Sequence, residues 1–269
     1  MNFNLDTFSS LYFAPAIIIL GLFGNLFGLI VISKKKLVKI GPQIVYITLF
    51  IFDWINFILI FQLYAAYEFN IDVTLFSSLY CKTYFYINFV FAPISPMLNV
   101  YISIERYISI AYLAKKDFLR QKKIQLIYII TIALFNIILY VPIGINYDLV
   151  IVENQTVCTY VDTFWQETYG YIDLTNRVII PFVLMIIFSI LIIYTIFTSR
   201  SRMASNTRAN RTFRKDVKFS LICITLNTSY IVFSLPISII FFIQNFWLNP
   251  FYKFFFFFFF TLLIWLIFI

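Results

Sequence analysis

The chain of 269 residues contains no histidine, only six glycines and three cysteines, and charged residues make up only 12% of it. Without histidine, the chain has no imidazole for acid–base catalysis, for a histidine-containing nucleophile triad or for binding a metal ion. The sequence also has no glycine-rich loop of the kind that holds a phosphate group. These absences predict a protein that is not an enzyme.

Apolar residues, in contrast, are abundant. Hydrophobic residues make up 62% of the chain and its mean hydropathy is +0.92, values far above those of soluble domains. Apolar stretches of about 20 residues, the length that a helix needs to cross a bilayer, recur along the sequence. We find no internal repeat, and we predict one all-α, multi-pass membrane domain over residues 1–269.

The basic residues are concentrated in three segments. Four lie in residues 34–39, six in 106–123 and seven in 200–218. Eight of the twelve acidic residues lie in the polar segments that alternate with these: Asp6, Glu68, Asp72, Asp148, Glu153, Asp162, Glu167 and Asp173. This alternation is the positive-inside pattern, so the basic segments are predicted to be cytoplasmic and the N-terminus extracellular. The net charge of +8 is therefore explained by membrane topology, and a nucleic-acid partner is not expected. We predict a plasma-membrane location within the lipid bilayer.

Seven helices are predicted from these patterns. They cover residues of about 11–33, 43–67, 80–112, 123–145, 171–198, 216–244 and 254–269. The seventh segment corresponds to about 24 Å of helix, which is less than the roughly 30 Å hydrocarbon core of a bilayer. We therefore expect either a truncated gene model or an incomplete seventh helix.

The third predicted helix has a cysteine near one end and a charged pair near the other. Cys81 and Arg106 are 25 residues apart, which corresponds to about 37 Å of helix and so to the full bilayer core. Cys158 is the one other cysteine outside an apolar run, and the charge pattern places it on the outer side with Cys81. Since extracellular conditions permit disulfides, we predict a Cys81–Cys158 bond.

The segment Ser-Ile-Glu-Arg-Tyr that contains Arg106 resembles the Glu/Asp-Arg-Tyr signature at the end of the third helix of rhodopsin-like (class A) G-protein-coupled receptors. The resemblance implies that Glu105, Arg106 and Tyr107 couple the receptor to a heterotrimeric G protein. It also implies an ionic pair between Arg106 and Asp216, which lies twenty residues before Pro236. Breaking this pair would allow the sixth helix to swing outward.

Asp53 lies deep in the second predicted helix, where an unpaired carboxylate is costly. Its surroundings resemble the Leu-x-x-x-Asp motif of the same family. The resemblance implies that Asp53 binds an allosteric sodium ion together with Ser95, eleven residues before Arg106; the alternative is a neutral Asp53 hydrogen-bonded within the bundle. Asn25 of the first helix is expected to bond to a neighbouring helix. We expect no cofactor apart from this sodium ion.

Four prolines are placed where they predict bends in helices. Pro93 and Pro96 remove two backbone donors from the third helix and predict a kink near its middle. Pro181 and Pro236 occupy the positions of the family's prolines in helices five and six. The sequence departs from the family beside Pro236, since the tryptophan expected there is Ser234.

The predicted ligand is extracellular and is a peptide. Asn88 occupies the position at which amine receptors carry an aspartate, so a small biogenic amine is disfavoured. The outer loop around Cys158 is acidic, which favours a cationic peptide; the same loop contains Asn154 in the one glycosylation sequon on the outer side. We expect four residues to line the ligand pocket: Asn88, Phe89, Ala92 and Phe241.

The resemblance therefore implies an orphan, peptide-receptor-like receptor that passes ligand binding on to a cytoplasmic G protein. Two other functions are compatible with a membrane bundle. A heptahelical protein that does not signal is suggested by the missing tryptophan of helix six. A transporter or channel would be expected to show internal repeats and several ionisable residues within its membrane spans.

Overall fold

The computed structural model describes residues 14–33, 42–69, 71–112, 116–152 and 155–200 and, in the next segment, residues 217–218, 220–221, 223–225 and 227–228. The predicted seventh helix, 254–269, and most of the sixth, 216–244, lie outside these residues. So do four predicted site residues: Asp216, Pro236, Phe241 and Asn154.

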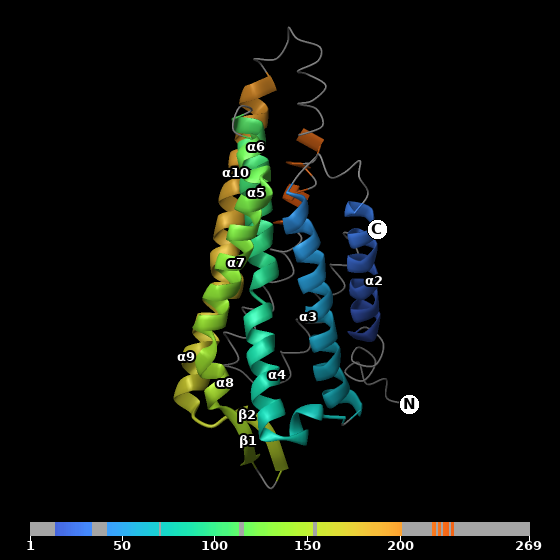
Figure 1. Ribbon diagram of the computed structural model, residues 1–269, viewed down its shortest axis with the longest axis vertical. Coiled ribbons are helices and arrows are strands. Elements are labelled where there is room, and N and C mark those ends of the chain that lie inside the picture. Colours follow the sequence, from blue (N-terminus) through green and yellow to red (C-terminus); the bar gives the residue numbers. More distant parts are fainter. Residues whose placement is uncertain are drawn as a thin grey trace, which may run out of the picture.

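The described residues are mostly helical. The elements in chain order are α2 (Ala14–Ile32), α3 (Gln43–Phe69), the short 3₁₀ helix η2 (Val73–Phe76), α4 (Ser78–Phe91), α5 (Ile94–Ala111), α6 (Lys116–Arg120), α7 (Lys122–Leu139), α8 (Val141–Asn146), β1 (Tyr147–Val152), β2 (Gln155–Tyr160), α9 (Thr163–Leu174), the π turn η3 (Thr175–Ile179) and α10 (Ile180–Arg200). The long helices run side by side along the long axis of the molecule (Figure 1). The strands β1 and β2 lie at one end, called here the hairpin end, and α6 lies at the other, called the Arg106 end.

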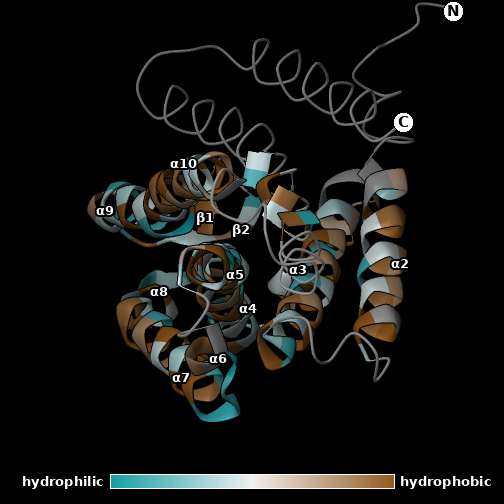
Figure 2. Ribbon diagram, turned by 90° about the horizontal axis from the view of Figure 1, so that it is seen from above, coloured by the Kyte–Doolittle hydropathy of each residue, from teal (hydrophilic) through white to brown (hydrophobic). Residues whose placement is uncertain are grey.

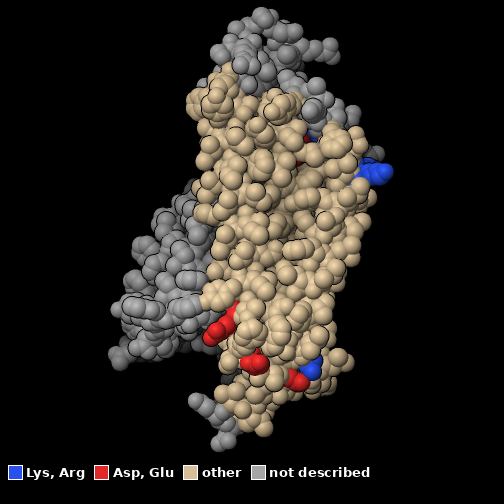
Figure 3. Space-filling model, turned by 90° about the vertical axis from the view of Figure 1, so that its left-hand side faces the viewer, with Lys and Arg blue, Asp and Glu red and all other residues tan. Residues whose placement is uncertain are grey.

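Four helical segments of the described residues are long and apolar enough to cross a membrane. They are Gln43–Ala66, Ser78–Ala111, Lys122–Asn146 and Thr163–Thr198. Their outward faces are largely hydrophobic (Figure 2), and Figure 3 shows a broad surface without charged side chains between the two ends of the bundle. Exposed apolar side chains such as Ile138 of α7 and Ile190 of α10 belong to the outward faces of these helices. Such a surface suits the hydrocarbon core of a bilayer.

The third predicted helix is divided into α4 and α5 at Ala92 and Pro93. Pro93 and Pro96 have no backbone N–H, so the regular helical bonding cannot pass through this point unbroken. Ala92 N still donates to Asn88 O at 3.0 Å, and Met97 N donates to Pro93 O at 3.3 Å. At the position predicted for a kink, the structure therefore has a short interruption between α4 and α5.

The segment 146–169, predicted to be a polar loop, contains the antiparallel hairpin of β1 and β2, in which Leu149 lies opposite Cys158. The fifth predicted helix also begins earlier than residue 171. Helix α9 starts at Thr163 because Asp162 accepts a hydrogen bond from Phe164 N at 2.9 Å and so caps the helix. The predicted fourth helix, 123–145, is observed as α7 followed by α8.

Helices α2 and α3 approach each other closely at two glycines. A Cβ atom on Gly21 would overlap the ring of Phe57, and one on Gly28 would overlap the ring of Phe50. Asn25 lies between these glycines and donates from Nδ2 to Gly21 O at 2.9 Å. This bond lies within α2, and the predicted bond of Asn25 to a neighbouring helix stays a prediction.

Three apolar clusters fill the described bundle; the smallest is formed by Ile110 of α5 and Ile192 of α10. The cluster in the half towards the Arg106 end joins α3, α5 and the segment after α10 through Val45, Leu49, Ile94, Leu98, Tyr101, Ile102 and Cys223. The cluster at the hairpin end joins α4, α8, the hairpin and α9 through Cys81, Val90, Tyr140, Ile143, Tyr147 and Tyr169. Helix α5 contributes to the first cluster and α4 to the second, and Phe91 of α4 packs against both, so the third predicted helix is the central element of the fold.

Gln125 of α7 connects three elements at the Arg106 end. Its Oε1 atom accepts from Ile44 N at 2.9 Å and from Val45 N at 3.4 Å, two amides in the first turn of α3. Its Nε2 atom donates to Arg120 O at 2.7 Å. The side chain is buried, so it satisfies helix-end groups that water does not reach.

We expect Gln125→Leu to lower the stability of the folded protein by about 2 kcal/mol, because it leaves buried backbone donors without an acceptor. The measurement is the thermal midpoint of the detergent-solubilised protein, followed by size-exclusion chromatography. Gln121→Leu is the matched control, since Gln121 is exposed and makes no side-chain capping bond at the start of α7. Equal midpoints for the two variants would contradict this role of Gln125.

Candidate functional site

Glu105 is the centre of a buried charged cluster at the Arg106 end. Its Oε2 atom lies 2.6 Å from Arg106 Nη2, and its Oε1 atom accepts from Arg120 Nε at 2.7 Å and from Ser109 Oγ at 2.8 Å. Arg120 Nη2 also donates to Ser109 Oγ at 2.9 Å. Glu105 and Arg106 are each only 1% exposed. One buried carboxylate is therefore shared by two arginines, which offsets part of the cost of burying the charges.

Two elements build this cluster. Glu105 and Ser109 are four residues apart on α5 and so face the same side of the helix. Arg120 comes from α6, which is held against α5 by a hydrogen bond from the Tyr101 hydroxyl to Leu119 O at 2.6 Å. The short helix α6 is thus fixed to α5 by both a charged and a neutral contact.

Tyr107 lies outside this cluster. The Tyr107 ring contacts the rings of Phe188 and Tyr112, at centroid distances of 6.0 and 6.3 Å. Asp216 lies outside the described residues, so its pairing with Arg106 stays a prediction.

A second polar site lies deeper in the bundle, at Asp53 of α3 and Ser95 of α5. Asp53 is half-buried and Ser95 is buried. Ser95 Oγ lies near the Asp53 carboxyl but makes no hydrogen bond of good geometry with any described residue. A carboxylate beside an unsatisfied hydroxyl oxygen is chemically suited to a small cation such as sodium, so the residues fit the predicted ion.

A third polar contact joins three segments that are distant in sequence. Asn227 Nδ2, in the segment after α10, donates to Ser103 Oγ of α5 at 2.9 Å and to Ser189 Oγ of α10 at 3.1 Å. Cys223 Sγ lies 3.7 Å from Ser103 Oγ. Asn227 and Ser103 are both buried. These bonds tie the described part of the predicted sixth helix to its two neighbours.

The hairpin end is held by a disulfide between Cys81 of α4 and Cys158 of β2, with a Cα–Cα distance of 5.8 Å. This bond confirms the prediction made from the position of the two cysteines. Lys82 Nζ also binds Asp148 Oδ2 of β1 at 2.9 Å. Hydrogen bonds from Ser78, then from Lys82 and from the Leu149 amide, lower the pKa of Asp148 to about 2. The hairpin is therefore attached to α4 both covalently and by charge.

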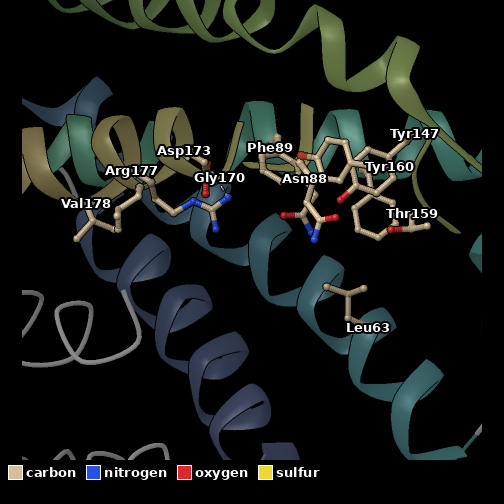
Figure 4. A pocket seen from close by; sticks show the side chains of 13 residues that line it. Leu63, Asn88, Phe89, Tyr147, Thr159, Tyr160, Gly170, Asp173, Arg177 and Val178 are labelled. Atoms are coloured by element: carbon tan, nitrogen blue, oxygen red, sulfur yellow. Dashed lines mark ion pairs between the residues drawn. The ribbon is translucent and has the colours of Figure 1, made fainter. Parts of the chain in front are cut away.

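Beneath the hairpin lies a pocket of about 390 Å³ (Figure 4). Its walls come from α3, α4, both strands, α9 and η3. The lining residues are Leu63, Phe85, Asn88, Phe89, Tyr147, Thr159, Tyr160, Gln166, Gly170, Asp173, Leu174, Arg177 and Val178. A pocket of this size with aromatic walls and a few polar groups is typical of sites that bind small molecules or the end of a larger ligand.

One side of this pocket is formed by an ion pair within the fifth predicted helix. Arg177 Nη2 lies 3.0 Å from Asp173 Oδ1, one helical turn away. The same carboxylate oxygen accepts a hydrogen bond from the Tyr140 hydroxyl at 3.1 Å. Tyr140 Oη in turn accepts from Asn176 Nδ2 at 3.2 Å, and Asn176 Nδ2 also donates to Asn136 Oδ1 at 2.7 Å. A chain of buried polar groups thus leads from α7 to the pocket.

Three of the residues predicted for the ligand pocket are described. Asn88 and Phe89 of α4 line the pocket. Ala92 lies at the interruption between α4 and α5 and is not among the described lining residues. Pro181 is buried near the start of α10, just after the π turn.

The sequence analysis did not identify Asp173, Arg177, Arg120 or Asn136 as site residues. A signal was present for the first two, because an acid and a base four residues apart in an apolar helix face the same side and rarely occur without a role. Arg120 looked like one of several basic residues of a cytoplasmic segment. Asn136 is a single amide in an apolar run, and no local sequence pattern indicates that such an amide belongs to a site.

The described residues thus form a bundle of apolar, membrane-type helices, with a buried acid–arginine pair at one end and a disulfide-anchored hairpin over a pocket at the other. Residues 24–269 match the 7 transmembrane receptor (rhodopsin family), and the chain belongs to this family. This match includes the segments predicted as helices six and seven, so the all-α, seven-helix fold class is confirmed.

The chain is also similar to a curated protein described as "Rhodopsin, GQ-coupled", from Mizuhopecten yessoensis. The two sequences are 26% identical over 251 residues, which cover 86% of this chain and 50% of the relative. The chain thus spans about half the length of the curated relative that it matches.

Proposed function

We propose that the chain is a plasma-membrane receptor that transmits binding of an extracellular ligand at the hairpin end to a heterotrimeric G protein at the Arg106 end. The observation that carries this proposal is the buried Glu105–Arg106 pair in a chain of the rhodopsin family. The family relationship and the basic segments near Arg106 support a cytoplasmic position for that end. Membership of this family argues against the transporter alternative.

In this proposal Arg106 changes partners when a ligand binds. In the ligand-free state it is held by Glu105 and, as predicted, by Asp216. A ligand that binds more tightly to the form with helix six displaced would shift the population towards that form. Arg106 would then reach the G protein. Because the relative is named as Gq-coupled, Gq is the first G protein to assay.

We also propose that Asp53 and Ser95 hold a sodium ion that favours the ligand-free form. A carboxylate and a hydroxyl oxygen are ligands that a hard cation accepts. Asn25 is proposed as part of the same polar core; its Nδ2 atom donates to Gly21 O, which leaves Oδ1 as the atom that could accept further contacts.

The ligand class that we propose is a peptide with basic residues. Its supporting residues are Glu153, Asp162 and Glu167 in the segment that precedes and begins α9. Asp162 and Glu167 are exposed, and Glu153 lies outside the described residues. Acidic side chains near the entrance of a pocket attract a cationic ligand and speed its association.

The test of this proposal measures nucleotide exchange on purified Gq with the receptor in lipid nanodiscs. We expect a library of basic peptides to contain members that stimulate exchange, while an acidic library of equal length does not. The combined change Glu153→Gln, Asp162→Asn and Glu167→Gln is expected to raise the half-maximal concentration of the active peptides about tenfold, at roughly 0.5 kcal/mol per exposed charge.

Asparagine is chosen for Asp162 because it preserves the cap of α9, whereas alanine would remove it. The control is the single change Lys82→Gln, which removes a charge at the same end but not an acidic one. An unchanged response of the triple variant to every active peptide would rule out the cationic peptide. Absence of exchange with all peptides and all G proteins would instead favour the heptahelical protein that does not signal.

A further inference from the structure

The described lining residues of the pocket include one acidic side chain, Asp173, and one basic side chain, Arg177. The two side chains differ in how much of each is exposed and can meet a ligand. Asp173 has 16% of its side chain exposed and Arg177 has 33%. Figure 4 shows the two side chains meeting at one side of the cavity, with Asn88, Tyr147 and Tyr160 further along it. The difference in exposure suggests that a ligand meets the guanidinium before it meets the carboxylate.

The Asp173 carboxylate is held in place by two neighbouring side chains. Its Oδ1 atom receives both the Tyr140 hydroxyl, at 3.1 Å, and Arg177 Nη2, at 3.0 Å. Tyr140 is completely buried, and its hydroxyl is held by Asn176, which is also buried. A ligand cation that approached Asp173 would have to displace these groups and pass the positive charge of Arg177. The carboxylate is therefore a support for Arg177 and a poor binding point for a cation.

Arg177 is arranged to bind an anion. Its guanidinium carbon lies 5.8 Å from the centre of the Phe89 ring, so the ring covers one side of the planar group. A guanidinium carries five N–H donors in a fixed fork, which is more than one carboxylate can accept, and it can be shared by two carboxylates. Asp173 on one side and a ligand carboxylate on the other would make such an arrangement.

The rest of the pocket favours an aromatic or apolar group beside that anion. Phe85 stacks on Tyr147 with ring centres 4.2 Å apart, and Tyr147 contacts Tyr160 at 4.1 Å. Asn88 and Gln166 add neutral polar groups to the lining. Aromatic walls with a few fixed polar groups bind an apolar body and orient it through its polar end.

We propose that the ligand of this pocket carries a carboxylate that binds Arg177, with Asp173, Tyr140 and Asn176 as positioning residues. This inference rests on the proposed function, since it assumes that the pocket beneath the hairpin is the ligand site. The carboxylate comes either from a small aromatic acid or from the C-terminus of a peptide. The second source is compatible with a basic peptide whose charged body remains near the acidic entrance.

The experiment measures binding directly, by saturation-transfer NMR and thermal shift on the full chain in nanodiscs without a G protein. The small probes are 4-hydroxyphenylacetate, its neutral amide 4-hydroxyphenylacetamide and the cation tyramine. The peptide probes are Lys-Phe-Tyr with a free C-terminus and the same tripeptide with an amidated C-terminus. We expect the acid of at least one pair to bind about tenfold more tightly than its amide. Preference in the first pair identifies a small acid, and preference in the second identifies a peptide C-terminus.

Variants separate the binding role of Arg177 from a merely structural one. Arg177→Gln is expected to abolish the preference for acid over amide, and Arg177→Lys to retain part of it. Asp173→Asn is expected to strengthen acid binding several-fold, because it removes the competing negative charge while its carbonyl oxygen can still accept from Tyr140 and Arg177. Lys82→Gln, a cation at the same end but outside the pocket lining, should leave the preference unchanged.

Three results would each overturn the inference. They are equal binding of acids and amides, no binding of any probe, and binding of tyramine that is lost in Asp173→Asn. Because no G protein takes part, failure here is distinguishable from failure of the proposed function. Acid binding that depends on Arg177 without any nucleotide exchange would support the inference and contradict signalling. Exchange stimulated by ligands that bind independently of Arg177 would contradict the inference and support the proposed signalling function.

Discussion

Removal of the Cys81–Cys158 disulfide is expected to lower the stability of the chain by about 4 kcal/mol and to reduce its amount at the cell surface severalfold. The bond joins residues separated by 77 positions, and closing a loop of that length removes much conformational entropy from the unfolded chain. It also attaches the hairpin whose residues Thr159 and Tyr160 line the pocket. Ligand binding should therefore decline along with stability.

The measurement compares Cys81→Ala, Cys158→Ala and the double variant by surface staining of intact cells and by thermal midpoint in detergent. The double variant should be no less stable than either single variant, because both lose the same bond. Cys223→Ala is the control: Cys223 is a free, buried cysteine, and its loss is expected to cost about 1 kcal/mol. Surface levels and midpoints of the disulfide variants equal to those of the unchanged chain would contradict the prediction.

Neutralising Glu105 is expected to raise ligand-free nucleotide exchange on the G protein roughly fivefold, which corresponds to a shift of about 1 kcal/mol in the equilibrium between the two receptor forms. Glu105 is the shared partner of Arg106 and Arg120. In Glu105→Gln both arginines lose their negative partner in a buried site. Arg106 can then move more easily towards the G protein, and Arg120 can move away from α5 together with α6.

The assay is exchange on Gq at equal surface expression. Arg120→Gln tests the contribution of α6 alone and should give a smaller rise, since the Glu105–Arg106 pair remains. Asp148→Asn is the control, because it removes a carboxylate of the hairpin end that is paired with Lys82 at the surface. If Glu105→Gln left ligand-free exchange unchanged, the cluster would be a structural support and not a restraint on signalling.

Several features of this protein follow from short-range sequence patterns. The apolar stretches required membrane helices because unsatisfied backbone groups are too costly in lipid. The spacing of Cys81 from Arg106 placed them at opposite ends of one helix, and the charge pattern then brought Cys158 to the side of Cys81. The Glu105–Arg106 pair was visible because its residues are adjacent and carry a known motif.

Other predictions failed where a local competitor decided the structure. The segment 146–169 was predicted to be a polar, acidic loop, but a strand pair forms there, and an aspartate cap at Asp162 starts α9 before the apolar run begins. Hydropathy detects the membrane span and not the helical turns that extend beyond it.

The sequence by itself determined the apolar membrane helices, the disulfide and the motif at the end of α5, because each depends on composition, on spacing along one helix or on adjacent residues. Only the tertiary structure decided that Arg120 joins Glu105, that Asn227 binds Ser103 and Ser189, and that Tyr140 supports the Asp173–Arg177 pair. These contacts join residues on different helices, and their partners depend on how the helices rotate and approach one another. Helix rotation and approach are set by packing of side chains over the whole bundle, which no local pattern of residues specifies.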